Sequence, residues 1–500
     1  MKRFKVLFII ILAGLPVNVL GQDDYEEALL KQFHQISSHE MYDWVETLSA
    51  PEFNGRMAGS PGGLAAAKWL ASHLKDWGIQ PGGTDSTYFQ WFDIGYNEFH
   101  ELGSLCLHIP GEGTRSIQKC YTFPDNFFPG MNTGSGEITA EVIYVGYGIT
   151  APEHGYDDYE GMDVKGKIVL VNRDAPYKET TSPDFEQWVR YCYHHYKLEN
   201  AVKHGAKGFI YIAGNHANPN IAHDPDIIVA GIGPEALNDF FANVEMDNAE
   251  ILEKINSTMK PHSFSMGNMV TMKANTTWHP DGKACNVIGY IEGSDSELKD
   301  EVIIIGGHYD AVGNCSVLLP GALDNASGTI DILAVAKAMS QSGISLKRSV
   351  MFLFIGGEEV GLLGSQSYVE NPTFLKENTI CYINLDMVGN GTGFSLGSGK
   401  THPELLKFFE EANNRFLHRT FRSSEERENY GRPRSDGEIF KRNGYRALGM
   451  GLTGWNKPVN YHQPNDQADL TIDPEIMEDV TKLLFVALTN MARAEHLELE

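Results

Sequence analysis

The C-terminal half of the chain alternates short apolar runs with segments of helical periodicity. Apolar runs without two-residue alternation lie at 286–291, 302–305, 349–355 and 379–385, and helical spacing marks 328–340 and 362–369. Such runs are typical of strands that are buried on both faces, and helices between them favour a parallel strand order. We therefore predict an α/β fold whose mostly parallel central sheet is flanked by helices.

The N-terminal half has a different pattern. After an acidic lead-in of helical character and a turn-rich segment at 49–61, one apolar helical face runs over 64–77. From 137 to 272 the chain changes to short strand-like runs, such as 141–148 and 167–171. We predict that this segment is a β-rich domain inserted into the main one.

The first residues have the pattern of an export signal. Basic residues within the first five positions precede the apolar stretch 6–15, and small or neutral residues follow before Gln22. This stretch is too short for a stable membrane anchor, and no later run is long enough to cross a membrane. We predict export to the periplasm or the extracellular space. The expected divisions are a signal peptide at 1–21, an N-terminal part of the main domain at 22–136, the insert at 137–272 and the rest of the main domain at 273–500.

Composition and charge narrow the class of protein. The chain has 500 residues, so more than one hydrophobic core is expected. Asp and Glu number 66 against 40 Lys and Arg, and the formal charge of −26 opposes binding to nucleic acid. The six cysteines are sparse and show no C-x-x-C spacing. Cys106 and Cys120 could pair across a hairpin in an oxidising compartment, or they could remain free buried thiols.

Acidic and histidine side chains gather at the ends of the predicted strands. Ligands of open α/β sheets bind beyond the carboxyl ends of the strands, so we expect these side chains to share one rim. The strand-end residues are His308 and Asp310 after 302–305, Glu358 and Glu359 after 349–355, and Asp386 after 379–385. Asp324, at the start of a predicted helix, and His462, in a loop, belong to the same set.

So many acids at one rim would repel one another, and bound cations would relieve that repulsion. Histidine and carboxylate ligands without cysteine suit zinc in a catalytic role. Two zinc ions about 3.5–4 Å apart would need one shared carboxylate. Asp310 lies two residues after His308 and fits a different task, because a ligating imidazole usually donates its second N–H to a carboxylate.

At these motifs the chain resembles the M28 family of co-catalytic zinc peptidases. The matching pieces are His308-Tyr-Asp310, Asp324-Asn325, Glu358-Glu359, Asp386, His462 and the block at 54–61. The segments 156–167 and 201–208 of the insert resemble a protease-associated (PA) domain. The resemblance implies a zinc exopeptidase fold with two zinc ions per chain. It implies that His308 and Asp386 hold one zinc, that Glu359 and His462 hold the other, and that Asp324 bridges them.

The resemblance also implies the catalytic roles. Glu358 would be the general base toward a water shared by the two zinc ions, and Tyr461 would donate to the developing oxyanion. The Asp324–Asn325 peptide bond would be cis, as in relatives. One difference is visible, because many relatives have Ser-Asp-His where this chain has Ser435-Asp-Gly437.

We therefore predict a secreted or periplasmic di-zinc aminopeptidase that removes N-terminal residues from peptide substrates. A carboxypeptidase or dipeptidase of the same family, a glutaminyl cyclase-like acyltransferase with one zinc, and a non-catalytic binding protein stay open as alternatives. Arg432 and Arg434 could clamp a substrate carboxylate, although arginines in polar loops are more often solvated. His194 and His195 lack nearby carboxylate patterning, and we interpret them as ordinary residues.

Overall fold

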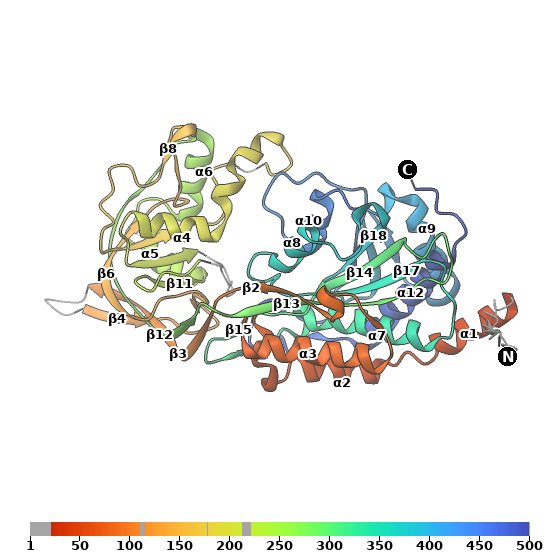
Figure 1. Cartoon of the computed structure of the whole chain (residues 1–500). Coiled ribbons are helices and arrows are strands. Elements are labelled where there is room, and N and C mark those ends of the chain that lie inside the picture. The colour runs from red at the N-terminus through yellow and green to blue at the C-terminus, as the bar shows by residue number, and fades with distance from the viewer. Residues whose placement is uncertain (1–21, 111–115, 178, 213–221, 500) are drawn as a thin grey trace, which may run out of the picture.

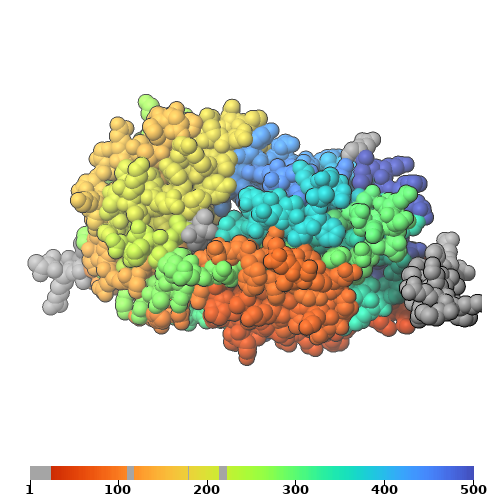
Figure 2. Space-filling view, in the orientation of Figure 1, coloured from red at the N-terminus to blue at the C-terminus, as the bar shows by residue number. Residues whose placement is uncertain are grey.

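The computed structural model describes residues 22–110, 116–177, 179–212 and 222–499. Two large sheets divide this part of the chain into two lobes (Figure 1). We call the lobe that contains both described termini the main lobe and the other the insert lobe. In the space-filling view the insert lobe packs directly against the main lobe (Figure 2). The predicted signal peptide at 1–21 lies outside the described residues.

The main sheet has nine strands within the described residues. At its centre β17, β14, β18 and β21 run parallel, which confirms the predicted mostly parallel α/β sheet. The order is β1 (Gln80–Pro81), β13 (Lys283–Ile291), β17 (Ser349–Ile355), β14 (Val302–His308), β18 (Thr379–Leu385), β21 (Ala447–Thr453), β19 (Gly393–Gly397) and β20 (Phe421–Ser423), and β2 (Phe89–Asp93) also pairs with β13.

One predicted strand runs against the direction of its neighbours. β13, which contains the apolar run at 286–291, pairs antiparallel with β17, β1 and β2. A strand that is buried on both faces has the same apolar pattern in either direction. The pattern therefore located this strand but could not give its direction.

Helices cover both faces of the main sheet. Ile303 and Ile305 pack into the core on one side, and Val302 and Ile304 pack into the core on the other. The first core includes α1 (Gln22–Phe33), α2 (Ser38–Leu48), α3 (Pro61–Asp76), α7 (Gly328–Gln341), α9 (Pro403–Ala412) and α12 (Pro474–Arg493). The second includes α8 (Leu363–Glu370) and α10 (Asp436–Arg442), which lie across the sheet from α7 (Figure 1). Burial on both faces explains the unbroken apolar runs.

The predicted helix at 64–77 is α3. The Ser60 hydroxyl accepts a hydrogen bond from the Gly63 N–H at 3.2 Å and so caps the first turn. Gly78, with φ of 71°, follows the last turn, as expected from the sequence. The apolar face buries Leu70 and Leu74 in the main core.

The insert lobe is built on an eight-stranded sheet within the described residues. Its order is β4 (Ser116–Cys120), β3 (Tyr96–Pro110), β12 (Phe264–His279), β6 (Gly136–Tyr144), β9 (Ile168–Val171), β10 (Gly208–Ile212), β11 (Ile228–Ile232) and β5 (Phe127–Pro129). The helices of this lobe are α4 (His194–Lys203), α5 (Pro234–Phe241) and α6 (Asn248–Thr258). Short strand pairs lie at β7 (Thr150–Ala151) with β8 (Tyr156–Asp157), and at β15 (Gly313–Asn314) with β16 (Leu318–Leu319).

The insert sheet draws strands from both sides of the predicted insert at 137–272. β3, β4 and β5 precede residue 137, and β12 extends past residue 272 to His279. Cys106 of β3 lies opposite Cys120 of β4, and a disulfide joins them. The remaining cysteines are buried free thiols, namely Cys192, Cys285, Cys315 and Cys381. Among the described residues, no helix has the length and apolar character needed to cross a membrane.

Candidate active site

Three parallel strands deliver the predicted site residues to one edge of the main sheet. His308 is the last residue of β14, and it pairs with Ile355, the last residue of β17. The strand β18 ends at Leu385, one residue before Asp386. Gly307 lets β14 and β18 approach each other closely, since a Cβ atom there would lie 2.2 Å from the Leu385 carbonyl oxygen. The rim expected from the strand ends is therefore present.

Asp324 lies between the two histidines of the predicted ligand set. Its Oδ1 is 3.4 Å from His308 Nε2, and its Oδ2 is 3.2 Å from His462 Nε2. His308 Nε2 also lies 3.5 Å from Asp386 Oδ1, and His462 Nε2 lies 2.9 Å from Glu359 Oε2. The other four predicted ligands thus form two groups, and each group faces a different oxygen of Asp324.

The cluster has the properties of a cation site. His308, Asp324 and Glu359 each offer one ligand atom, and these atoms all lie within 4.8 Å of one another. Glu359 Oε1 and Asp386 Oδ1 are buried without a hydrogen-bond partner. Burial, reinforced by the charge of Asp324, raises the pKa of Glu359 to about 7. Clustered carboxylates with unused oxygens fit a divalent cation, and the histidine and carboxylate donors fit zinc.

Glu358 lies beside this cluster without belonging to the ion pairs around Asp324. It lines the same pocket as Glu359 and His462. Burial raises the pKa of Glu358 well above its ordinary value, and the charges of Glu359 and Asp436 act in the same direction. A carboxyl group with a raised pKa holds a transferred proton more readily, which suits a general base.

Asp310 is buried behind the ligands. His308 Nδ1, the nitrogen that faces away from Asp324, lies 3.2 Å from the backbone carbonyl oxygen of Asp310 and 3.6 Å from its Oδ1. The Asp310 carboxylate also accepts hydrogen bonds from the backbone N–H groups of Glu358 and Glu359, at 3.2 and 3.3 Å. This is the position expected for a carboxylate that orients a ligating imidazole.

Asn325 fixes the loop that carries Asp324. Its side-chain amide donates to the carbonyl oxygens of His308 and Leu385, at 3.2 and 3.0 Å, and so joins the ends of β14 and β18. The Asn325 Oδ1 accepts from the N–H of Gly328 at 3.0 Å, at the start of α7. The Asp324–Asn325 peptide bond is cis, as the resemblance implied.

Asp466 supports the same loop and belongs to none of the predicted site residues. Its carboxylate accepts hydrogen bonds from the N–H groups of Leu323 and Asp324, at 2.9 and 3.1 Å. Burial raises the pKa of Asp466 to about 6. The only signal for this residue in the sequence was its place four residues after His462.

Arg56 is a second supporting residue outside the predicted site residues. Its side chain is fully buried, and it donates to the carbonyl oxygens of Tyr309, Leu48, Pro320 and Gly321 at 2.7–2.8 Å. Tyr309 precedes Asp310, and Gly321 begins the turn into Asp324. Arg56 therefore connects the loop that carries Asp310 to the loop that carries Asp324.

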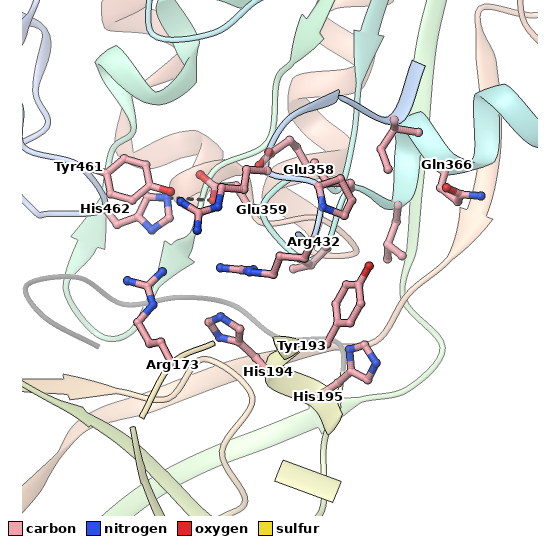
Figure 3. Close-up of a pocket in the computed structure, with 17 residues that line it drawn as sticks. Arg173, Tyr193, His194, His195, Glu358, Glu359, Gln366, Arg432, Tyr461 and His462 are labelled. Atoms are coloured by element: carbon pink, nitrogen blue, oxygen red, sulfur yellow. Dashed lines mark ion pairs between the residues drawn. The ribbon is translucent and has the colours of Figure 1, made fainter. Parts of the chain in front are cut away.

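A pocket of about 550 Å³ opens above Glu358 and Glu359. Tyr461 lies at its wall with a 40% exposed side chain, and its ring stacks on that of His462 at a centroid distance of 3.7 Å. Residues of the insert lobe form the facing wall (Figure 3). These are Arg173, Tyr193, His194 and His195.

The facing wall has no signature in the sequence. His194 and His195, which the sequence predicts to be ordinary residues, both line the pocket. Arg432 and Arg434 also line it, although loop arginines were expected to be solvated. No local pattern could have identified Arg173 or the two histidines, because packing between the lobes brings them to the site.

Two parts of the chain match known families. Residues 286–488 match peptidase family M28, and residues 138–240 match the PA domain. These are the parts of the chain whose motifs resemble the same two families.

Individual relatives agree with this family. Aminopeptidase YwaD of Bacillus subtilis is 29% identical over 254 residues, which cover 48% of this chain and 45% of the relative. The probable leucine aminopeptidase 2 of Aspergillus oryzae is 35% identical over 138 residues, which cover 25% of this chain and 26% of the relative. The chain thus spans less than half the length of these curated relatives.

A solved structure shares the fold over nearly the whole chain. The zinc aminopeptidase BSAP from Bacillus subtilis matches with a TM-score of 0.60 at 19% identity. The match covers 92% of this chain and 96% of that chain. Both the main lobe and the insert lobe are therefore part of the shared architecture.

Proposed function

We propose that this protein is an exported di-zinc aminopeptidase that removes N-terminal residues from peptides. The observation that carries the proposal is the position of Asp324, whose two oxygens face two separate groups of ligand-type side chains. His308 and Asp386 would hold one zinc, Glu359 and His462 would hold the other, and Asp324 would be shared. The relatives named as aminopeptidases support the same activity.

Zinc, when bound at such a site, polarises a peptide carbonyl and lowers the pKa of water. Glu358 accepts the proton of the attacking water and later passes it to the leaving amine. Asp310 keeps the Glu358 backbone and the His308 ring in place. Tyr461, at the pocket wall, donates its hydroxyl hydrogen to the developing oxyanion.

The charge of the site favours the N-terminus of a peptide. An aminopeptidase must neutralise an α-ammonium group, and carboxylates near the metals provide that charge. Glu358, Glu359 and Asp386 all lie at this rim, and no lysine or arginine joins the ion pairs of the ligand cluster in the described part of the chain. The site therefore favours binding of an ammonium group next to the metals.

A carboxypeptidase or dipeptidase of the same family is the second candidate. One observation favours it, because Arg432 lines the pocket and a guanidinium can bind a C-terminal carboxylate through two hydrogen bonds. A curated relative from Zea mays, named probable glutamate carboxypeptidase VP8, is 34% identical over 139 residues, 26% of this chain and 18% of that relative.

Three substrates separate these activities. We expect the zinc-loaded enzyme to cleave leucine amide and to leave N-acetyl-leucine amide intact, because the free amine is required. An N-blocked dipeptide with a free carboxylate should also resist. Cleavage of this last substrate alone would contradict the aminopeptidase proposal, and the Glu358→Gln variant prepared in parallel controls for contaminating peptidases. A count of one zinc per active chain, with cyclisation of N-terminal glutamine, would instead indicate a cyclase.

The proposed export has its own test. The segment 1–21 has the pattern of a signal peptide. N-terminal sequencing of the protein recovered from the periplasm or the medium should start at Gln22. A mature protein that still begins at Met1 would contradict export through this segment.

A further inference from the structure

Two guanidinium groups from different lobes point into the pocket above the metal ligands. Arg173 follows β9 of the insert lobe, and Arg432 lies in the main-lobe segment before α10. Figure 3 shows both side chains directed toward the space in front of Glu359 and His462. These two arginines form a cationic side of the pocket, and Glu358 and Glu359 form its acidic side.

Unlike Arg348 and Arg419, these two arginines have no carboxylate partner among the described residues. Arg348 pairs with Glu301, and Arg419 pairs with Asp479, at 2.5 Å each. Neither Arg173 nor Arg432 forms an ion pair with any residue that the structure describes. The Nε of Arg432 is moreover buried without a hydrogen-bond partner. A buried guanidinium N–H without an acceptor is costly, so this position suits an anionic ligand.

The neighbouring charges are mostly positive as well. Arg434 lines the same pocket, and the fully buried Lys197 donates to the backbone carbonyl oxygens of Asp174 and Tyr147. Asp174 itself is exposed and forms no ion pair with Arg173. The local field therefore favours a carboxylate in front of Arg173 and Arg432.

We propose that Arg173 and Arg432 form a subsite for a substrate carboxylate, which holds the C-terminus of a short peptide while its N-terminal residue lies at the metals. The inference rests on the proposed aminopeptidase activity. A pocket of about 550 Å³ is of a size that encloses a small ligand rather than a folded chain. The acidic side binds the ammonium end, the cationic side binds the carboxylate end, and the distance between them selects peptide length.

The kinetic consequence is a preference for peptides with a free carboxylate. A charge-assisted contact with a partly buried guanidinium is strong enough to change kcat/KM on the order of 10–100-fold. The matched substrates are Leu-Gly-Gly with a free C-terminus, its C-terminal amide, and Leu-Glu-Gly amide. The first two differ only in the terminal charge, and the third moves a carboxylate to a side chain.

We expect the wild-type enzyme to favour the free acid over the amide mainly through a lower KM. Arg432→Gln and Arg173→Gln should each bring the ratio of acid to amide toward one. Arg422→Gln is the matched control, because Arg422 is exposed on β20 of the main lobe and lines no part of this pocket. If Leu-Glu-Gly amide shows the full preference, the subsite binds acidic side chains rather than the C-terminus, which overturns the assignment to peptide ends.

A binding measurement keeps this test separate from the proposed activity. Zinc-loaded Glu358→Gln protein is titrated calorimetrically with the acid and with the amide of the same tripeptide. Tighter binding of the acid, lost on adding Arg432→Gln, supports the subsite whichever peptide end is cleaved. Equal affinity for both forms overturns the subsite even if the enzyme is an aminopeptidase. Failure to cleave any free-amine peptide, with the binding preference intact, contradicts the aminopeptidase proposal alone.

Discussion

The Oδ1 atom of Asp310 lies 3.6 Å from Nδ1 of His308, while Asp324 and Asp386 face the opposite nitrogen of the same ring. The Asp310 carboxylate also accepts the backbone N–H groups of Glu358 and Glu359. One buried carboxylate thus positions a predicted ligand of one zinc, a predicted ligand of the other and the predicted general base.

Replacing Asp310 should therefore weaken metal binding without removing a ligand. In Asp310→Asn the amide nitrogen cannot accept a hydrogen bond, so either the His308 contact or a backbone contact is lost. Loss of such a partner typically lowers metal affinity about 10–100-fold. Zinc retained after dialysis against graded chelator measures the effect, with Asp281→Asn, at an exposed position, as control. Wild-type zinc retention in Asp310→Asn would exclude the positioning role.

The adjacent acids Glu358 and Glu359 should respond differently to the same change. Glu358→Gln keeps the shape of the side chain but removes the proton acceptor, so turnover should fall about 10²–10⁴-fold with zinc retained. Glu359→Gln should lose zinc, because Glu359 pairs with His462 in the ligand cluster. The two variants control for each other when zinc content and kcat are measured together. Near-wild-type kcat in zinc-loaded Glu358→Gln would show that another group is the base.

Removing the guanidinium of Arg56 should destabilise the two loops that carry Asp310 and Asp324. Arg56→Met leaves the carbonyl oxygens of Tyr309, Pro320 and Gly321 without their buried donor. We expect a loss of about 3 kcal/mol in the free energy of unfolding, together with weaker zinc binding. Denaturant unfolding measures the first effect and chelator competition the second.

Arg348→Met is the matched control for Arg56→Met. Arg348 is also buried, but it binds Glu301 and the Ala494 carbonyl oxygen rather than the loops at the site. It should destabilise the protein while zinc affinity stays unchanged. If both variants lower zinc affinity equally, the effect of Arg56 is only a general loss of stability.

Local sequence was sufficient to bring three of the five predicted ligands together, because strand ends carry them. His308, Glu359 and Asp386 each follow an apolar run, and parallel neighbours bring such ends to one edge. The direction of β13 could not be predicted, since burial on both faces gives one pattern for both directions.

Residues that act through long-range packing left no such pattern. Arg56 binds backbone carbonyl oxygens, and any residue type supplies these, so its partners have no signature in the sequence. Arg173 and His194 reach the pocket only because the insert lobe packs against the main lobe (Figure 2). The motifs that carry the predicted ligands are acidic, and Arg173 adds a cationic group to the facing wall of the pocket.

The insert lobe should be removable without loss of the metal site. Asp93 of β2 lies opposite Lys283 of β13, and the Ile94 N–H donates to the Gly282 carbonyl oxygen at 3.0 Å, so the chain leaves and re-enters the main lobe at adjacent points. Replacing residues 95–281 by an Asn-Gly turn should keep zinc binding and leucine amide hydrolysis, because all five predicted ligands lie outside this segment. A folded variant that binds no zinc would show that the insert builds the site.

Lys197 should make the stability of the insert lobe depend on pH. Burial lowers its pKa from 10.5 to about 8, although the charges of Cys192 and Asp158 act to raise it. Between these pH values the unfolded chain binds more protons than the folded one, so the free energy of unfolding rises with pH.

The Lys197→Met variant lacks this contribution. The stability of wild type minus that of the variant should therefore increase from pH 8 to 10.5 by up to about 1.4 kcal/mol per pH unit. Denaturant unfolding at several pH values measures it. Lys203→Met, at an exposed position of the same helix, should give a flat difference, and an equally flat result for Lys197→Met would show that the buried amine is not destabilised by its charge.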